Sequence, residues 1–477
     1  MKPANPNPET RNRQLSGRRA LVLGLGESGL AMARWLARRG ARVRVADTRV
    51  EPPFAQELRH AAAGVEIVSG PFSDALLDGV DLLGLSPGLA PGQAPIVAAR
   101  ARGIEVVGEI ELFARALIEL GWRAHTKVLA VTGTNGKTTV TSMLGEMCRS
   151  AGLTAAVAGN ISPAALTVLM RCLDQGRPPR AWVMELSSFQ LETMRSLAPD
   201  AAVVLNVSDD HLDRYRDLAE YAATKARIFR GAKAQVLNRQ DARVMAMRGE
   251  GRRVLSFGLD APPGEEDVGI IRRGGRRFLA QGAQALMPVS ALALAGAHNV
   301  ANAAAALAMC RAIGLPAGPL AEALSSFCGL PHRVERIARI GGVAFYDDSK
   351  GTNVGATLAA LTGLGRKVAL IAGGEGKGQD FSPLAPALAR HARAVVLIGR
   401  DAPIIERAIA ASGVPVFHAA DMKAAVERAW ASVGRGEAVL LSPACASFDM
   451  FRNYAHRAEV FADAVRALGA RLMGERQ

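Results

Sequence analysis

The first part of the chain alternates short apolar runs with a segment of helical periodicity. The runs Arg19-Ala-Leu-Val-Leu and Ala41-Arg-Val-Arg-Val-Ala flank the stretch from Ser28 to Arg39, in which apolar positions recur every three or four residues. Short apolar runs bounded by turn residues predict β-strands, and the intervening period predicts an amphipathic helix. The order strand, helix, strand predicts a βαβ unit with parallel strands.

The same alternation recurs in two further segments. The second begins near Glu109 and the third near Pro331, where Gly329-Leu-Pro331 marks a hinge. Residues 249–282 are rich in glycine and charge and predict hairpins at a sheet edge. We expect an α/β protein with domains at residues 1–108, 109–330 and 331–477, each built on a parallel sheet covered on both faces. The other expected elements are strands at 127–131, 181–184, 201–206, 343–346, 368–372, 394–398 and 438–441, and an alanine-rich helix at 299–313.

Composition restricts the class of protein. At 477 residues the chain is too long for one core, and its 49% hydrophobic content is that of ordinary globular domains. No apolar run is long enough to span a membrane, and the polar stretch from Met1 to Arg13 predicts a disordered tail and not a signal peptide. The cysteines lack paired spacing, which disfavours disulfides and a zinc site and fits a reducing cytoplasm; they are Cys148, Cys172, Cys310, Cys328 and Cys445.

The net charge of +14 raises the question of a nucleic-acid partner. The arginines are spread along the chain and aromatic residues make up only 5%, so no platform for stacking bases is visible. We interpret the charge as a solvated surface with a preference for anionic small molecules. A nucleic-acid-dependent ATPase stays open as the less favoured alternative.

The clearest chemistry lies in Val128-Leu-Ala-Val-Thr-Gly-Thr-Asn-Gly-Lys-Thr-Thr139. An apolar strand leads into a glycine-containing turn, and Lys137 with two threonines opens a helix. Such a loop directs backbone N–H groups toward an anion, the lysine reaches the β- and γ-phosphates of a nucleotide, and the Thr138 hydroxyl can bind Mg²⁺. Gly133 stands closer to Gly136 than the strict P-loop pattern requires. We therefore predict a shortened phosphate-binding loop and a central domain of the P-loop ATPase type.

Two glycine-containing turns in the Rossmann-like first domain suit a nucleotide. Gly24-Leu-Gly26-Glu-Ser-Gly29 follows a strand, and Asp47 ends the next strand at a spacing suited to a ribose hydroxyl. This fingerprint leaves an NAD(P)-dependent dehydrogenase open as an alternative, although any Rossmann-like turn needs such glycines for steric reasons. Ser86-Pro-Gly88 is a second turn with free N–H groups, or a plain β-turn.

Three polar positions stand out in the central domain. Glu185 ends a buried strand, where an open α/β sheet binds its ligand, so its carboxylate either holds Mg²⁺ or caps the next helix. His211 lies among acids in Asn206-Val-Ser-Asp-Asp-His-Leu-Asp213 and can bind a metal or orient a reacting group. Lys225, considered alone, is expected to be a solvated surface lysine.

Three polar loops in the third domain also follow strands. Tyr346-Asp-Asp-Ser-Lys-Gly-Thr-Asn353 and Gly373-Gly-Glu-Gly-Lys-Gly378 combine glycines with a cation, which suits phosphate or carboxylate binding. Ser442-Pro-Ala-Cys-Ala-Ser-Phe-Asp449 follows the last strand. Cys445 has no histidine near it in the sequence, so we expect a buried structural thiol and not a nucleophile.

Taken together and in this order, the motifs resemble those of the Mur ligase family, ATP-dependent amide-forming enzymes of peptidoglycan precursor synthesis. The resemblance covers nearly the whole chain. Residues 206–215, 348–357 and 442–449 most resemble the branch that adds D-glutamate, and the Asp-Asn-Pro-Arg signature of the diaminopimelate- or lysine-adding branch is absent. The family resemblance is carried by Thr132-Gly-Thr-Asn-Gly-Lys-Thr138, Glu185-Leu-Ser-Ser188, Asp210-His-Leu-Asp213, His298-Asn-Val-Ala-Asn302, Pro331-His-Arg333 and Asp348-Ser-Lys350.

The resemblance implies a ligand for each domain. The first domain would bind the UDP part of UDP-N-acetylmuramoyl-L-alanine, and the residues that match the precursor site are Ser28, Asp47, Thr48, Ser86, Asn160 and His211. The central domain would bind ATP through Gly133, Thr134, Asn135, Gly136, Lys137, Thr138, Thr139, Asn299 and Asn302, with Arg333 and Asp348 closing from the third domain. The Rossmann-like third domain would surround D-glutamate with Lys350, Thr352, Lys377, Ser447 and Tyr454. Two Mg²⁺ ions would be held by Thr138, Glu185, His211 and Lys225, the lysine as a carbamate.

Three positions differ from the residues usual in the family. Glu27 stands where an apolar or small residue often lies beside the uracil. Ser162 follows Ile161 where glycine is more usual, and Tyr454 takes the place of a familiar phenylalanine.

The resemblance also implies a mechanism. The alanyl carboxylate would attack the γ-phosphate of ATP to form an acyl phosphate, which the amine of D-glutamate then attacks. Lys137, His211 and Lys225 would be catalytic, because two anions approach each other and their charge must be neutralised. An acyl phosphate hydrolyses readily, so closure of the third domain would exclude water. We expect a cytoplasmic monomer with no nucleic-acid partner and no membrane span; another Mur-type or folylpolyglutamate-type ligase stays open as an alternative.

Overall fold

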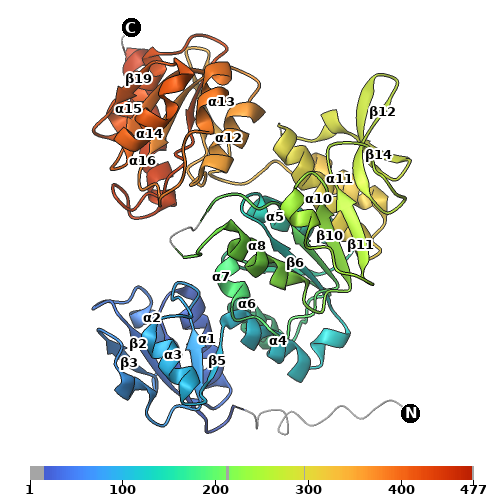
Figure 1. Cartoon of the computed structure of the whole chain (residues 1–477), viewed down its shortest axis with the longest axis vertical. Helices are drawn as coiled ribbons and strands as arrows, with labels where there is room; N and C mark the ends of the chain where they lie inside the picture. Colours follow the sequence, from blue (N-terminus) through green and yellow to red (C-terminus); the bar gives the residue numbers. More distant parts are fainter. Residues whose placement is uncertain (1–14, 211–213, 295, 475–477) are drawn as a thin grey trace.

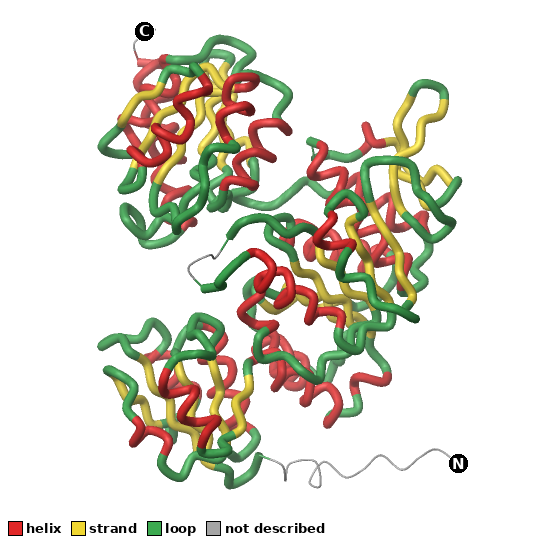
Figure 2. The backbone as a smooth tube through the Cα atoms, in the orientation of Figure 1, coloured by secondary structure: helices red, strands yellow, loops and turns green. Residues whose placement is uncertain are grey.

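The computed structural model describes residues 15–210, 214–294 and 296–474. Its strands form three sheets, and helices lie on both faces of the strands (Figure 2). We call the parts built on these sheets the first, central and third domains. The first and third domains lie on either side of the central domain, as the colours from blue to red show (Figure 1).

The first domain contains five parallel strands in the order β3-β2-β1-β4-β5. The chain changes direction across the sheet between β1 and β4, so the loops after these two strands open a crevice at their carboxyl ends. The elements are β1 (Arg19–Leu23), α1 (Glu27–Arg38), β2 (Arg42–Asp47), α2 (Ala55–Ala61), β3 (Glu66–Ser69), η2 (Asp74–Leu77), β4 (Leu82–Leu85), α3 (Ala94–Ala101) and β5 (Glu105–Val107).

The central domain contains nine strands in the order β14-β13-β12-β11-β10-β9-β6-β8-β7. The strand pairs from β7 to β12 are parallel, and β12, β13 and β14 are joined by antiparallel hairpins at the other edge. The strands are β6 (Lys127–Thr132), β7 (Ala155–Gly159), β8 (Ala181–Glu185), β9 (Ala201–Val204), β10 (Ala234–Asn238), β11 (Arg253–Phe257), β12 (Val268–Arg273), β13 (Arg276–Gln281) and β14 (Gln284–Pro288). The helices are α4 (Glu109–Glu119), α5 (Lys137–Ser150), α6 (Ala165–Asp174), α7 (Ser188–Leu191), α8 (Leu218–Ala226), α9 (Ala242–Met245), α10 (Ala297–Ala312) and α11 (Ala317–Ser326).

The third domain contains six strands in the order β15-β16-β20-β17-β18-β19. Strand β15 pairs antiparallel with β16, and the other pairs are parallel. The elements are β15 (Glu335–Ile340), β16 (Val343–Asp347), α12 (Val354–Gly363), β17 (Val368–Gly373), α13 (Leu384–His391), β18 (Ala392–Ile398), α14 (Ala402–Ile409), β19 (Val416–His418), α15 (Met422–Ala431), β20 (Ala438–Leu441) and α16 (Tyr454–Gly474).

The hydrophobic cores show how the domains are joined. Buried residues of α1, α4 and α6 belong to one apolar cluster, which runs from Trp35 in the first domain through Phe113 to Trp182 in the central domain. The third domain has two clusters of its own, one on each face of its sheet. Apolar packing therefore joins the first domain to the central domain, whereas the third domain meets the central domain through the polar contacts described below.

The predicted fold class is confirmed, and the predicted strands and helices occur within a few residues of their expected positions. The hairpins expected within 249–282 lie at the edge of the central sheet. We expected a purely parallel third sheet, and this expectation is wrong. A tight Gly341-Gly342 turn reverses the chain after β15, so that β16 runs antiparallel to it. The expected N-terminal tail lies outside the described residues. Over the described part of the chain, no helix has the length and apolarity needed to cross a membrane.

Candidate active site

A phosphate-binding loop connects β6 to α5. Gly133 and Gly136 have φ angles of 151° and 84°, which glycine adopts most readily. A Cβ atom at Gly136 would lie 2.6 Å from Oδ1 of Asn302, so only glycine fits beneath this side chain. The loop ends at the start of α5, where Thr138 and Thr139 are buried in the first turn. The loop and helix predicted from the sequence are both present.

The Lys137 side chain folds back inside this loop. Its Nζ donates to the carbonyl oxygens of Gly133 at 2.8 Å and Thr134 at 2.7 Å. Enclosure by the loop lowers the pKa of Lys137, and the carboxylates of Glu185 and Asp210 oppose that shift. The ammonium group is thus positioned where the loop would place the phosphates of a nucleotide.

The loop after β9 is joined to the phosphate-binding loop. The backbone N–H of Asn135 donates to Oδ1 of Asn206 at 2.8 Å, and Nδ2 of Asn206 donates back to the carbonyl oxygen of Asn135 at 3.1 Å. The hydroxyl of Thr134 is bonded to the backbone of Ser208 in the same way. The predicted acidic segment therefore starts beside the phosphate loop; His211 itself lies outside the described residues.

Glu185 presents an unpaired carboxylate oxygen beside the loop. The residue is 2% exposed, and its Oε1 accepts a hydrogen bond from Nδ2 of Asn160 at 2.7 Å. Its Oε2 is buried and has no hydrogen-bond partner among the described residues. Buried carboxylate oxygens normally have a hydrogen-bond partner. A hard divalent cation such as Mg²⁺ can take the place of that partner, because carboxylate oxygens bind such cations directly. Glu185 and Thr138 therefore fit the predicted Mg²⁺ site, and Glu185 does not cap the following helix, which has its own capping box at Ser187.

Lys225 is buried, so the expectation of a surface lysine is wrong. The residue is 1% exposed on α8, and its Nζ donates to the carbonyl oxygen of Gly133 at 2.9 Å. The Nζ also lies 4.3 Å from the centre of the Tyr221 ring. Burial, aided by the charge of Lys137, lowers the pKa of Lys225 well below its ordinary value. The tertiary fold carries this lysine to the phosphate loop, as the family resemblance implied.

A cavity of about 310 Å³ lies between the central and third domains. Asn135, Gly136 and Thr139 of the phosphate loop line one side, with Asn299 and Asn302 of α10. The third-domain side carries Arg333, Asp348 and Lys350. The structure thus brings together, around one cavity, seven of the residues predicted for ATP.

The third domain contacts the phosphate loop through side chains. Nη2 of Arg333 donates to Oγ1 of Thr138 at 2.6 Å. The amides of Asn135 and Asn353 exchange two hydrogen bonds of 3.1 Å. Lys377 places its Nζ 3.9 Å from the Asp210 carboxylate. All these contacts between the two domains are polar and few, which suits a surface that opens and closes.

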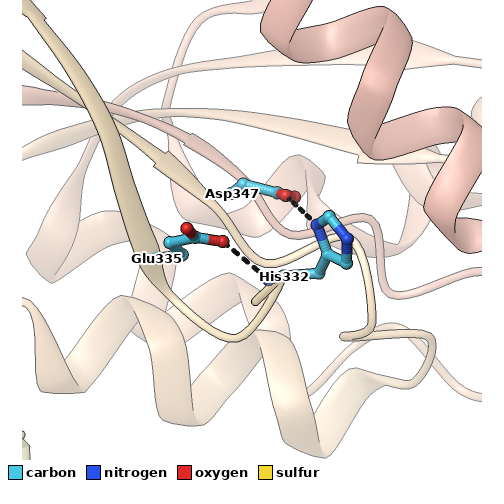
Figure 3. Close-up of side chains that lie close together, drawn as sticks. All are labelled: His332, Glu335 and Asp347. Atoms are coloured by element: carbon cyan, nitrogen blue, oxygen red, sulfur yellow. Dashed lines mark hydrogen bonds and ion pairs between the residues drawn. The ribbon is translucent and has the colours of Figure 1, made fainter. Parts of the chain in front are cut away.

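The hinge segment before β15 is held by a histidine between two acids. Nδ1 of His332 lies 2.6 Å from Oδ2 of Asp347, and the backbone N–H of His332 donates to Oε2 of Glu335 at 3.0 Å (Figure 3). His332 and Val334 have φ angles of 62° and 51°, a left-handed conformation that is unusual for residues other than glycine. These contacts hold the backbone on both sides of Arg333 and so aim its guanidinium at the central domain.

Three loops of the third domain converge at one edge of its sheet. They follow the neighbouring strands β16, β20 and β17, whose carboxyl ends lie together. Oγ of Ser442 donates to Oδ2 of Asp348 at 2.7 Å, and Glu375 and Ala446 form an isolated antiparallel bridge. The residues predicted for D-glutamate lie on these loops and at the start of α16: Lys350, Thr352, Lys377, Ser447 and Tyr454.

Individual side chains in this region differ in their surroundings. Nζ of Lys350 lies 5.0 Å from the Tyr454 ring centre, and Ser447 is buried. Burial raises the pKa of Asp348 to about 7 and that of the Cys445 thiol to about 12. Cys445 is therefore the buried, unreactive thiol that the sequence predicted.

The fully buried Arg457 of α16 holds two of these loops and was missed by the sequence analysis. Its Nη2 donates to the carbonyl oxygen of Ser349 at 2.7 Å and its Nη1 to that of Cys445 at 3.1 Å. Burial lowers the pKa of Arg457 to about 10. A lone arginine in a long helix carries no sequence signal for such a role.

The glycine loop of the first domain is closed by Asp47 and Ser86. Oδ2 of Asp47 accepts from the backbone N–H of Leu25 at 2.7 Å, and both carboxylate oxygens are bonded by Arg49. These hydrogen bonds, chiefly from the Arg49 guanidinium, lower the pKa of Asp47 to about 2. Oγ of Ser86 donates to the carbonyl oxygen of Gly24 at 2.7 Å. The two predicted turns thus meet in the crevice between β1 and β4, with Ser28 and Thr48 beside them.

Glu27 reaches across to the central domain. Its Oε1 accepts from Oγ of Ser162 at 2.8 Å and from the backbone N–H of Ala164 at 3.0 Å. Two of the three positions that differ from the usual family residues, Glu27 and Ser162, are therefore bonded to each other.

Family models match three consecutive parts of the chain. The "Mur ligase MurD-like, N-terminal domain" matches residues 18–108, the "Mur ligase middle domain" residues 131–310 and the "Mur ligase, glutamate ligase domain" residues 332–445. The chain belongs to the Mur ligase family. The resemblance stated from the motifs is thereby confirmed.

Curated Mur ligases match the chain over nearly its full length. The UDP-N-acetylmuramoylalanine–D-glutamate ligase of Aromatoleum aromaticum is 59% identical and covers 95% of this chain and 98% of its own. Enzymes of the same name from Ralstonia nicotianae and Nitrosomonas europaea are 54% and 52% identical, with coverage of 94% and 95% of this chain and 97% of theirs.

Solved Mur ligase structures share the fold at low sequence identity. The UDP-N-acetylmuramate–alanine ligase of Thermotoga maritima gives a TM-score of 0.59 at 19% identity, over 94% of this chain and 99% of that one. The MurF ligase of the same organism in complex with ADP gives 0.59 at 16% identity, over 96% and 97% of the two chains. A family match in every domain leaves the dehydrogenase and nucleic-acid alternatives without support.

Proposed function

We propose that this Mur ligase joins D-glutamate to UDP-N-acetylmuramoyl-L-alanine with cleavage of ATP to ADP and phosphate, a step of peptidoglycan precursor synthesis. One observation carries the proposal: the phosphate loop, α10 and the third-domain segments with Arg333, Asp348 and Lys350 line one cavity between two domains. The unpaired oxygen of Glu185 belongs to a carboxylate that interacts with Lys137 of the same loop. The relatives named for this reaction are more than half identical to the chain. The reaction needs a nucleotide, a metal and an amino acid at one junction, which is what this arrangement offers.

The proposed division of labour follows the three domains, with boundaries near residues 108 and 330. The first domain binds the UDP part of the precursor through Ser28, Asp47, Thr48 and Ser86, and Asn160 and His211 would bind its acyl end. The central domain binds ATP, with Arg333 and Asp348 completing the site from the third domain. The third domain binds D-glutamate through Lys350, Thr352, Lys377, Ser447 and Tyr454. Support comes from the convergence of these loops at strand ends, where open α/β sheets bind ligands.

In the proposed reaction, side chains of the protein neutralise negative charge and exclude water. The alanyl carboxylate attacks the γ-phosphate and displaces ADP, which gives an acyl phosphate. The amine of D-glutamate then attacks the acyl carbon, loses a proton and displaces inorganic phosphate to give the amide. Lys137 neutralises negative charge that develops as the anions approach. Bound Mg²⁺, held by Thr138, Glu185 and His211, would supply further positive charge at the phosphates. The third domain brings Arg333 and the amino acid to the site and excludes water from the acyl phosphate. Its polar, sparse contacts with the central domain allow that movement.

We further propose that Lys225 carries a carbamate when the enzyme is active. A free ammonium group beside Lys137 and a metal site would be repelled by both, whereas a carbamate reverses the charge and can bind the metal. The amine must be neutral to react with CO₂, and the buried position beside Lys137 favours the neutral amine. The geometry supports this proposal because Nζ of Lys225 lies 2.9 Å from the carbonyl oxygen of Gly133 in the phosphate loop.

Chemical rescue tests the carbamate. Lys225→Ala should lose most activity, and acetate or formate should restore part of it by placing an anion in the vacated space. Lys233→Ala removes an exposed lysine from the same domain and serves as the control, with normal activity and no response to either acid. Crystals grown near neutral pH with Mg²⁺ should show density beyond Nζ of Lys225. A bare ammonium in clear density, together with no rescue, would rule the carbamate out.

We propose that the protein acts in the cytoplasm as a monomer. ATP and the nucleotide precursor are cytoplasmic substrates, and the five cysteines are free thiols. The residues proposed for all three substrates come from one chain, so no second copy is needed to complete the site.

An ADP-release assay tests the proposed specificity. The enzyme should release ADP with UDP-N-acetylmuramoyl-L-alanine only when D-glutamate is present, and L-glutamate, L-alanine and L-lysine should give background rates. Turnover with L-glutamate and a folate in place of the precursor would instead support a folylpolyglutamate-type ligase.

A further inference from the structure

Arg214 joins the first domain to the central domain through a fork of hydrogen bonds. Its Nη1 donates to the carbonyl oxygen of Pro87 at 3.0 Å, and its Nη2 donates to that of Leu89 at 3.1 Å. The same guanidinium is paired with both carboxylate oxygens of Glu192, from Nε at 3.2 Å and from Nη2. The arginine side chain is 9% exposed and the glutamate side chain 12%. This is a directed, largely desolvated contact between two domains.

The surroundings fix the guanidinium in one orientation. It lies over the Phe189 ring at 4.2 Å from the ring centre, and the Tyr215 hydroxyl donates to Oε1 of Glu192 at 2.9 Å. An arginine held by a carboxylate on one side and a ring on its face has few alternative rotamers. Nη1 and Nη2 of Arg214 are therefore rigidly placed donors for the carbonyl oxygens of Pro87 and Leu89.

Both ends of the fork belong to segments next to the proposed sites. Pro87 and Leu89 flank the turn that starts at Ser86, whose hydroxyl closes the glycine loop in the β1–β4 crevice. Glu192 directly follows α7, and α7 begins three residues after Glu185. The fork therefore links the first-domain turn to the segment that follows the proposed metal ligand at the end of β8.

The apolar contact between the first and central domains cannot by itself fix how the two domains are oriented. It lies along α1, α4 and α6, and hydrophobic packing has little directional preference. Glu27 adds hydrogen bonds with Ser162 and Ala164 along the same α1–α6 contact, about which the first domain can still rock. The Arg214 fork supplies a further directional attachment, at the crevice.

We propose that Arg214 is a positioning residue, which fixes the distance between the nucleotide end and the acyl end of the precursor site. The inference rests on the proposed function, because the separation matters only for a substrate held at both ends by two domains. Arg214 itself contacts neither end, so its effect should be specific to a ligand that spans the domains.

Kinetics with two variants test the positioning role. Arg214→Gln removes the fork, and the KM for UDP-N-acetylmuramoyl-L-alanine should rise about tenfold, because two hydrogen bonds from a charged group are lost. Arg214→Lys keeps the charge but offers one point of donation, so its effect should be intermediate. The KM for ATP and the Kd for UDP alone should change less than twofold in both. Asp174→Asn, which breaks the exposed Arg38–Asp174 pair between α1 and α6, is the matched control and should leave all these constants unchanged.

Two kinetic outcomes would overturn the proposal. A fall in UDP affinity as large as the change in precursor KM would place Arg214 within the nucleotide site. Equal changes in the KM values for precursor and ATP, or no change in either, would mean that the fork only stabilises the fold.

A distance measurement separates this inference from the ligase proposal, since it needs no turnover. Spin labels at Val97→Cys, an exposed site on α3, and at the exposed native Cys328 report the separation of the two domains in a Cys172→Ala background. The distance distribution should be narrow in the parent and in Asp174→Asn and broad in Arg214→Gln. An unchanged distribution in Arg214→Gln would overturn the positioning role even if the enzyme is a D-glutamate ligase.

Discussion

Replacing Glu109 by glutamine should make the protein more stable above neutral pH, although it removes a charge that caps a helix. Glu109 is 2% exposed at the start of α4, and its Oε1 accepts from the backbone N–H of Leu166 at 2.7 Å in the first turn of α6. Its Oε2 is buried without a hydrogen-bond partner among the described residues. A glutamine keeps the acceptor and removes the buried charge.

The size of the effect follows from the pKa of this carboxyl. Burial, with a smaller contribution from the charge of Glu27, raises the pKa of Glu109 from 4.5 to about 7. At about 1.4 kcal/mol per pKa unit, this difference corresponds to roughly 3 kcal/mol of stability. Because the folded state binds the proton more tightly, this stability is present below pH 4.5 and is lost as the pH rises through 7. Glu109→Gln should therefore gain up to about 3 kcal/mol over wild type at pH 8 and nothing at pH 4.5.

Urea unfolding followed by tryptophan fluorescence measures this difference. Trp35 and Trp182 both belong to the apolar cluster around α1, α4 and α6, so their emission reports the relevant region. The midpoint of Glu109→Gln should rise above that of wild type as the pH increases from 4.5 to 7, and the gap should stay constant at higher pH. Asp174→Asn removes an exposed carboxylate from the neighbouring helix and should show no pH-dependent gap. A gap for Glu109→Gln that is constant across pH, or that shrinks as pH rises, would refute the reasoning.

Substitutions at Lys137, Lys377 and Glu27 test the proposed sites and the contact between the first two domains. Lys137→Ala should lower turnover by about 10³-fold or more, because charge stabilisation at the phosphates is lost. Calorimetry should show nearly unchanged binding of the precursor. A loss of precursor affinity as large as the loss of turnover would refute separate sites. Lys377→Ala should raise the D-glutamate KM about tenfold or more, since a charged partner is lost. The KM for ATP should change little. An unchanged D-glutamate KM would refute the assignment of Lys377 to the D-glutamate site. Glu27→Leu should raise the precursor KM about fivefold, because the hydrogen bonds to Ser162 and Ala164 are lost. Glu27→Gln keeps the acceptor oxygen, so its precursor KM should stay near the wild-type value. Equal effects of the two substitutions on this KM would argue against hydrogen bonding.

Local patterns predicted most of the fold. Buried strands of parallel sheets are continuous apolar runs, and the phosphate loop is encoded by consecutive residues from Gly133 to Thr139. These features depend on neighbours in sequence, which is why their positions were correct to within a few residues. The antiparallel β15 was not predicted because its alternating pattern is weak, although the Gly341-Gly342 pair before β16 is a hairpin signal that could have indicated it.

Contacts between distant residues could not be predicted from pattern alone. Lys225 is buried against Gly133, 92 residues earlier, and a single lysine on a helix gives no sign of this. Arg214 bonds to Pro87, 127 residues away. Glu27 and Ser162 each differed from the family pattern, but only the fold shows that they are bonded to each other. In each case the deciding factor is burial and pairing in three dimensions, which sequence periodicity does not encode.

The fate of the oxygen atoms of the alanyl carboxylate tests the central claim most directly. UDP-N-acetylmuramoyl-L-alanine labelled with ¹⁸O in that carboxylate would be incubated with the enzyme, ATP, Mg²⁺ and D-glutamate, and both products analysed by mass spectrometry. Formation of an acyl phosphate predicts that label passes into inorganic phosphate in step with an amide product that contains D-glutamate. Unlabelled phosphate, or release of ADP without that amide, would contradict the account.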